Sequence, residues 1–104
     1  MGADLYYKGQ YAFRDSYNKW SIFRPLDLSW WRDVVPMCDE RGNLSPEKAK
    51  ELREILIDKK RIWSYKVEGV YLPEYVTATN QGIDELIGLL TKAIEENSPI
   101  ECSL

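Results

Sequence analysis

The sequence contains no histidine. This absence excludes histidine-based general acid–base catalysis and every catalytic triad that uses histidine. It also removes the side chain that most often binds transition metals. Cysteine is scarce: Cys38 and Cys102 lie far apart and form no CxxC pair, so they cannot build a structural zinc site within one chain. We expect both thiols to be free in a reducing cytosol, with a disulfide or a reactive thiol as the alternative.

Phosphate-binding glycine loops and membrane-spanning segments are missing as well. The six glycines are scattered singly along the chain, which excludes a glycine-rich phosphate loop. No stretch approaches the roughly 18 apolar residues of a transmembrane helix. Asp4 and Lys8 interrupt the short apolar opening, so we expect no secretory signal. The sequence therefore predicts a cytoplasmic protein that has no membrane partner and no cofactor.

Positive charge is also in short supply. The chain has 14 Lys and Arg against 17 Asp and Glu, a net charge of −3, so it lacks the broad basic surface of a general nucleic-acid-binding protein. The acidic residues match neither an EF-hand nor a magnesium-dependent phosphatase pattern. The carboxylates considered for a metal site are Asp15, Asp33, Asp39, Glu40 and Asp58. We predict no metal site and no catalytic residue, and a hydrolase that acts through carboxylates is the least favoured function.

What the chain does have is enough apolar side chains for one folded domain. Its 104 residues are 44% hydrophobic and 30% charged, a balance typical of globular domains. A chain of this length buries roughly 60–70% of its unfolded surface. We predict a single compact domain over residues 1–104. Its fold class is α+β and mostly helical, with three to four helices packed around an aromatic core and a small sheet formed by the N- and C-terminal strands.

A helical period follows the first predicted strand, which covers residues 3–8. Its basis is a set of aromatic residues at spacings of three and four, namely Phe13, Tyr17, Trp20 and Phe23. This spacing predicts a helix over residues 11–23. Pro25 ends that helix, because the residue before a proline is pushed out of the helical region.

Capping residues predict the later helices. Ser29 or Asp27 can cap a short helix over residues 30–37. Ser45 followed by proline marks the start of a longer helix over residues 46–62.

The C-terminal half of the chain contains one more helical stripe. It predicts a single helix over residues 73–96, weakened near residues 80–82, where a glycine occurs. Residues 63–72 are ambiguous between a short hairpin arm and an extended connection. The alternating residues 100–104 can pair with the N-terminal strand.

The stretch from residue 13 to residue 33 concentrates aromatic and arginine side chains. An exposed tryptophan beside an arginine suits stacking on a nucleobase, and a planar guanidinium suits bidentate binding of phosphate or carboxylate. The predicted ligand-binding residues are Arg14, Tyr17, Asn18, Arg24, Trp30, Trp31 and Arg32. The simpler interpretation is that the aromatic residues form the core and that the arginines pair with Asp15 and Asp33.

We favour non-catalytic binding over catalysis. The first hypothesis is a protein that sequesters a small anionic, nucleotide-like ligand through the aromatic and arginine side chains. Such a protein would self-associate to complete its pocket. The second hypothesis is a protein-interaction module, or an inhibitor that covers a host protein with its aromatic and acidic surface, because interfaces favour Trp, Tyr and Arg.

Three motifs together resemble a known family. They are the opening MGADLY, the FRDSYN block followed by LSWW and a GNLSPEKA helix start, and the terminal PIECSL. The combination resembles a family of small, uncharacterised proteins from bacterial and viral reading frames that begin MGADLY and end in CSL. The longer relatives carry an additional charged helical segment before the FRDSYN block, where only residues 7–12 intervene here. The resemblance implies a compact intracellular domain, the shortened form would fit a viral gene, and no mechanism is implied.

Overall fold

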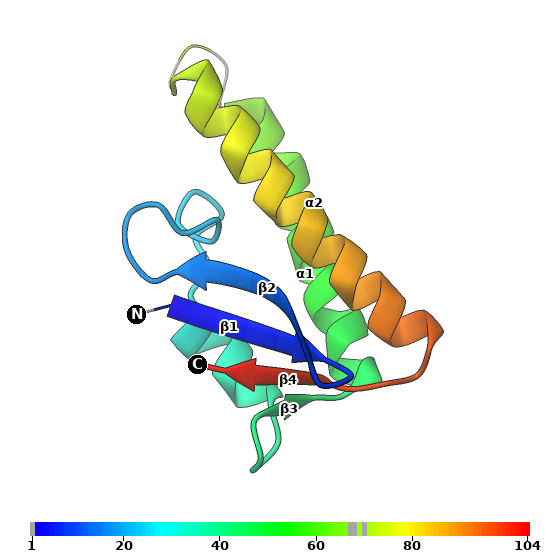
Figure 1. The fold of residues 1–104 in the computed structure, drawn as a ribbon. Coiled ribbons are helices and arrows are strands. Elements are labelled where there is room, and N and C mark those ends of the chain that lie inside the picture. The colour runs from blue at the N-terminus through cyan, green and yellow to red at the C-terminus, as the bar shows by residue number, and fades with distance from the viewer. Residues whose placement is uncertain (1, 67–68, 70) are drawn as a thin grey trace.

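A computed structural model describes residues 2–66, 69 and 71–104. A four-stranded antiparallel sheet packs against a hairpin of two long helices (Figure 1). The strands are β1 (Gly2–Tyr7), β2 (Gln10–Ser16), β3 (Asn43–Leu44) and β4 (Ile100–Ser103), in the order β2-β1-β4-β3. The helices are α1 (Pro46–Lys66) and α2 (Pro73–Glu95), with a short π-helical turn, η1 (Trp30–Val34), followed by a 3-10 turn, η2 (Val35–Met37). The predicted α+β class, with helices around an aromatic core, is confirmed.

The small sheet joins the two ends of the chain, as predicted. β1 and β4 are antiparallel neighbours, with Leu5 opposite Cys102 and Tyr7 opposite Ile100. These four side chains are buried, because alternate residues of a strand face the same side of the sheet. The lower half of the helical hairpin covers that side, and its upper half projects beyond the sheet (Figure 1).

The predicted helix over residues 11–23 is wrong. Residues 10–16 form β2, and the following residues make a series of turns. Lys8 and Gly9 both have positive φ angles, 51° and 80°, which is the geometry of a two-residue hairpin turn. This turn folds β2 back onto β1, so that Phe13 and Asp15 face the core with a period of two. The aromatic spacing that resembles a helix therefore spans a strand and a loop.

The short helix after this loop is confirmed, and so is its cap. η1 and η2 together occupy residues 30–37. The Ser29 hydroxyl accepts a hydrogen bond from the Arg32 backbone N–H at 3.3 Å. The Asp33 carboxylate in turn accepts one from the Ser29 N–H at 2.8 Å. Both bonds satisfy backbone donors at the start of the helical turn.

The helix α1 begins as predicted and ends later than predicted. The Ser45 hydroxyl accepts a hydrogen bond from the Lys48 N–H at 3.2 Å. The helix continues to Lys66, four residues past the expected end, because Trp63 still belongs to its buried stripe. The Trp63 indole N–H donates to the Asn80 side-chain oxygen at 3.2 Å, which ties α1 to α2. Residues 67, 68 and 70 of the ambiguous connection lie outside the described residues.

The C-terminal helical stripe forms one helix, α2, which runs antiparallel to α1 (Figure 1). Gly82 lies at the predicted weak point and has a packing role. A Cβ atom at this position would lie 2.6 Å from Cγ2 of Ile22, closer than two such atoms can approach. The glycine therefore lets the loop between β2 and η1 lie directly on α2. None of the described helices is both long and apolar enough to cross a membrane.

Candidate functional site

The segment from Tyr17 to Ser29, here called the aromatic loop, is held in place by Asp15 at the end of β2. The Asp15 carboxylate is buried. It accepts hydrogen bonds from the Ser21 hydroxyl at 2.6 Å, the Trp30 indole N–H at 2.7 Å and the Ile22 backbone N–H at 3.2 Å. A buried carboxylate requires such partners, because its desolvation is costly. Asp15 therefore joins both ends of the loop, whereas the sequence suggested an ion pair with arginine.

The floor of the site is a stack of buried aromatic rings. Phe23 lies 4.3 Å from Trp30 between ring centroids, with an interplanar angle of 23°. Phe13 approaches the same indole at 6.4 Å. Trp30 is only 2% exposed, so its faces are occupied by the protein. Trp30 shapes the site, and it cannot itself stack on a ligand without rearrangement.

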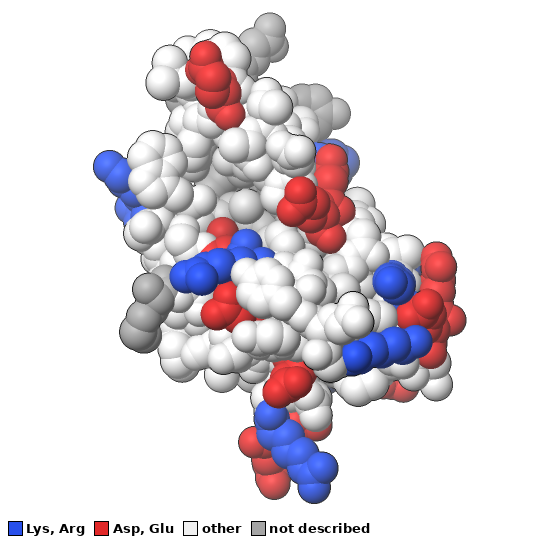
Figure 2. Space-filling view, viewed as in Figure 1, with Lys and Arg blue, Asp and Glu red and all other residues white. Residues whose placement is uncertain are grey.

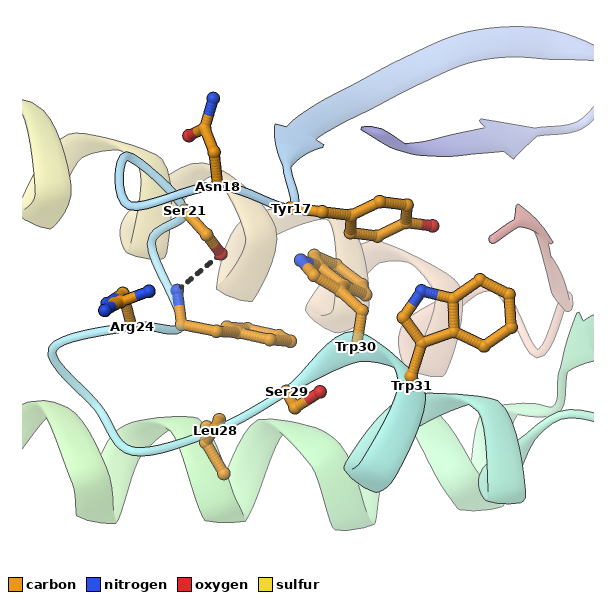
Figure 3. A pocket seen from close by; sticks show the side chains of 9 residues that line it. Tyr17, Asn18, Ser21, Arg24, Leu28, Ser29, Trp30 and Trp31 are labelled. Carbon is orange, nitrogen blue, oxygen red and sulfur yellow. Dashed lines mark hydrogen bonds between the residues drawn. The ribbon is translucent and has the colours of Figure 1, made fainter. Parts of the chain in front are cut away.

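A cavity of about 210 Å³ lies between the aromatic loop and the start of η1 (Figure 3). Five of the seven predicted residues line it, namely Tyr17, Asn18, Arg24, Trp30 and Trp31. Sequence reasoning missed the other four lining residues, which are Ser21, Phe23, Leu28 and Ser29. The spacing of Phe23 predicts a place in a helical stripe, and Ser21 and Leu28 carry no signal that distinguishes them along the chain.

Trp31 and Arg24 lie at opposite ends of the group of lining side chains, with Trp30 between them (Figure 3). Trp31 is 57% exposed, and its ring centroid lies 6.0 Å from that of Tyr17, at an interplanar angle of 51°. Arg24 is also exposed. Within the described part of the chain, no carboxylate lies at ion-pair distance from its guanidinium. The Trp31 ring and the Arg24 guanidinium are therefore both available to a ligand.

The other two predicted arginines do not line the cavity. Arg14 lies on β2 opposite Asp4, and its Nε is 3.9 Å from the Asp4 carboxylate. Arg32 forms a salt bridge to Asp33 at 2.9 Å and donates to the Asp27 carbonyl at 2.7 Å. The Arg32 hydrogen bond holds the pKa of Asp33 below its ordinary value. For Arg14 and Arg32, the alternative of intramolecular ion pairs describes the observed contacts.

The polar tips of Tyr17 and Asn18 are arranged differently. The Asn18 side-chain oxygen accepts from the Ser16 hydroxyl at 2.9 Å and from the Trp20 N–H at 2.8 Å. Its amide points away from the other labelled side chains (Figure 3). The Tyr17 hydroxyl is buried without a hydrogen-bond partner among the described residues, and burial raises the pKa of Tyr17. The Asn18 oxygen thus closes a turn, and its amide N–H groups remain available as donors. The Tyr17 hydroxyl has no such partner among the described residues.

The wider surface carries both signs of charge. Figure 2 shows acidic and basic side chains scattered over one face of the molecule, with neutral surface between them. Binding of an anion at the cavity therefore depends on individual side chains rather than on a broad basic field. Among the residues that the structure describes, no three His, Cys, Asp or Glu side chains are grouped so that they could hold a metal ion.

Comparisons with known proteins find no relative. No family model, no curated protein and no solved structure matches the chain. The family resemblance of the MGADLY, FRDSYN and CSL motifs stays a prediction. Any function must therefore be inferred from the chemistry of the site itself.

Proposed function

We propose that the protein binds a small anionic ligand with a planar aromatic group, such as a nucleotide, and does not transform it. One observation carries this proposal: an exposed tryptophan, and an arginine that has no acidic partner among the described residues, lie on the same cavity beside a stack of buried aromatic rings. Trp31 provides the stacking surface and Arg24 the positive charge. The protein would act as a sequestering protein for such a ligand.

The contribution of Trp31 follows from its position on η1. Its neighbour Trp30 is anchored by Asp15, and the Trp31 ring packs 6.0 Å from that of Tyr17, so the aromatic face is in place without a ligand. A fixed aromatic face loses little conformational entropy on binding. Stacking of a base on such a face contributes about 1–3 kcal/mol.

The contribution of Arg24 is charge and geometry. A guanidinium presents paired N–H donors that match phosphate or carboxylate oxygens. Hydrogen bonds to charged groups contribute roughly 1.5–3 kcal/mol each. Because the chain has a net charge of −3, a ligand anion gains little from the rest of the surface, and Arg24 would supply most of the attraction.

The size of the cavity favours self-association. At about 210 Å³ it is smaller than the roughly 300–1,000 Å³ of typical ligand pockets. One protomer would then enclose only part of a nucleotide. A second copy of the chain that covers the remainder would raise affinity, and ligand addition would shift the population toward the oligomer.

Calorimetry against a panel of nucleotides and cyclic nucleotides tests the proposal. Trp31→Ala and Arg24→Ala should each weaken binding by roughly tenfold to a hundredfold. Trp20→Ala and Arg14→Ala are matched controls, because these residues are also exposed but do not line the cavity. They should leave the affinity unchanged. A folded protein that binds nothing on the panel, or that loses binding equally in all four variants, would refute the proposal.

A second candidate function is binding of a protein partner, and a separate surface favours it. Trp20, Tyr71 and Leu72 are 63%, 44% and 72% exposed, and they surround Tyr75 in a shallow depression of about 360 Å³. Exposed apolar patches of this kind are typical of interaction sites. A pull-down from host lysate should recover a stoichiometric partner that Trp20→Ala loses and Trp31→Ala keeps. Recovery of no partner would count against this candidate.

A further inference from the structure

The fold brings together two cysteines that lie far apart in the sequence. Cys38 follows η2, and Cys102 lies on β4. The Cys102 N–H donates to the Gly42 carbonyl at 2.9 Å, and the Gly42 N–H donates to the Asp39 carbonyl at 3.0 Å. This hydrogen-bonded turn places the residue after η2 beside the C-terminal strand. Both cysteines line one cavity of about 220 Å³, which Trp31 also lines.

The two thiols are free and lie on the same cavity. Neither forms a disulfide in the structure. Each thiol donates to a backbone carbonyl, Cys38 to Val34 at 3.5 Å and Cys102 to Ile100 at 3.7 Å. The neighbouring Cys102 thiol lowers the pKa of Cys38, whereas the neighbouring Cys38 thiol together with burial raises the pKa of Cys102. Cys38 is half-buried and Cys102 is buried. Free cysteines often serve only as small apolar core residues, but two free thiols on one cavity can also react with each other.

We propose that Cys38 and Cys102 are a redox-modification site, which forms an intramolecular disulfide when the folded protein meets a small disulfide oxidant such as oxidised glutathione. The Cys38 thiolate, the more exposed of the two, attacks one sulfur of the oxidant. A mixed disulfide forms at Cys38, and one glutathione leaves as its thiolate. The Cys102 thiol then gives up its proton and attacks the Cys38 sulfur, which breaks the mixed disulfide and releases a second glutathione. The protein loses two electrons and two protons, and the oxidant gains them.

The consequence of this bond is a covalent link between β4 and the segment after η2. The link closes a long loop that contains α1 and α2, and closure of a long loop restricts the unfolded chain. The thermal midpoint of the oxidised protein should therefore rise by on the order of 10 °C. The bond would also fasten one wall of the cavity beside Trp31, although the inference does not depend on ligand binding there.

Equilibration of the reduced full-length chain with oxidised glutathione, followed by acid quenching and intact mass measurement, tests the inference. The expected product is a monomer that has lost two hydrogen atoms, carries no glutathione and takes up no alkylating agent. The same treatment in urea is the control. The effective thiol concentration should be at least about tenfold higher in the folded than in the unfolded chain.

Two single variants test the order of the steps. Cys102→Ser should accumulate a stable glutathione adduct at Cys38, because no second thiol resolves it, whereas Cys38→Ser should react slowly. The inference is overturned if the folded wild type keeps two free thiols, or accumulates the same adduct as Cys102→Ser. It is also overturned if the chain forms the disulfide equally well in urea.

Discussion

Replacement of Asp15 should disrupt the candidate site more than any other single substitution in its neighbourhood. The buried carboxylate accepts three hydrogen bonds, from Ser21, Ile22 and the Trp30 indole. Asp15→Ala removes both acceptor oxygens, and with them all three hydrogen bonds. The donors would remain inside the fold without partners, and the aromatic loop would lose its connection to β2.

The magnitude follows from the number of donors left unsatisfied. Each buried donor without a partner costs about 1–3 kcal/mol. Water can enter the vacated space and satisfy part of them, so we expect Asp15→Ala to lower the free energy of unfolding by about 3–5 kcal/mol. That is a large share of the roughly 5–15 kcal/mol of a typical domain. Asp15→Asn keeps one oxygen but turns an N–H₂ group toward donors, and should cost about 1–3 kcal/mol.

Urea unfolding followed by tryptophan fluorescence measures both variants, and Asp15→Asn keeps the test informative if Asp15→Ala does not fold. Asp4→Asn is the matched control on the neighbouring strand. Among the described residues, the Asp4 carboxylate makes a 3.4 Å contact with the Tyr11 hydroxyl and a 3.9 Å contact with Arg14 and no others. Asp4→Asn should therefore change stability by less than about 0.5 kcal/mol. If Asp15→Asn matches Asp4→Asn, and the Trp30 indole N–H exchanges with solvent as in the wild type, the reasoning fails.

Two further perturbations test the packing and the electrostatics. Gly82→Ala should destabilise the protein by about 1–3 kcal/mol, because the new methyl group meets Ile22. Gly88→Ala adds a methyl group that meets nothing within 4 Å, and should stabilise the protein by about 0.5–1 kcal/mol. The midpoints of urea unfolding measure both effects, and equal shifts in the two variants would contradict the close approach of Ile22 to Gly82. Asp33 has a pKa below its ordinary value because of Arg32. The ionised Asp33 carboxylate therefore stabilises the folded protein fully above the pKa that Asp33 has in the unfolded chain, and this stabilisation is lost as the pH falls through the lower pKa of the folded state. Wild type should therefore lose more stability than Asp33→Asn between about pH 5 and pH 2, and parallel loss in both would contradict this assignment.

The elements that the sequence predicted correctly are those whose signals are local. Ser45 with its following proline, and the alternation in residues 100–104, each specify their own structure within a few positions. The same is true of the short helix that Ser29 caps. In these places local preference and tertiary packing agree.

The predicted helix over residues 11–23 failed because two periods overlap. Phe13 and Phe23 fit a helical spacing, but Phe13 belongs to a strand face and Phe23 stacks on Trp30. Gly9 and Gln10 predict a turn or an entry loop, but the positive φ angle at Lys8 that shapes the hairpin has no sequence signature. Tertiary pairing with β1 therefore overrode the local pattern.

Most of the residue types that line the candidate site were predicted from the sequence, but the contacts that hold them in place were not. Arg14 and Arg24 look alike along the chain, yet only Arg24 lies on the cavity. The role of Asp15 as an acceptor for three neutral donors, and the shared cavity of Cys38 and Cys102, depend on distances between segments that no local pattern encodes. Such distances are set by the packing of the whole domain and become known only from its structure.

A nuclear magnetic resonance titration of the four tryptophan indole N–H groups tests the central claim most directly. The four tryptophans lie in three settings: Trp31 and Trp30 line the cavity, Trp20 lies in the exposed apolar depression and Trp63 is buried between the helices. A nucleotide that binds at the proposed site should shift the Trp31 resonance most, Trp30 less, and the other two little. A shift confined to Trp20, or no shift across a panel of nucleotides and cyclic nucleotides, would contradict the account.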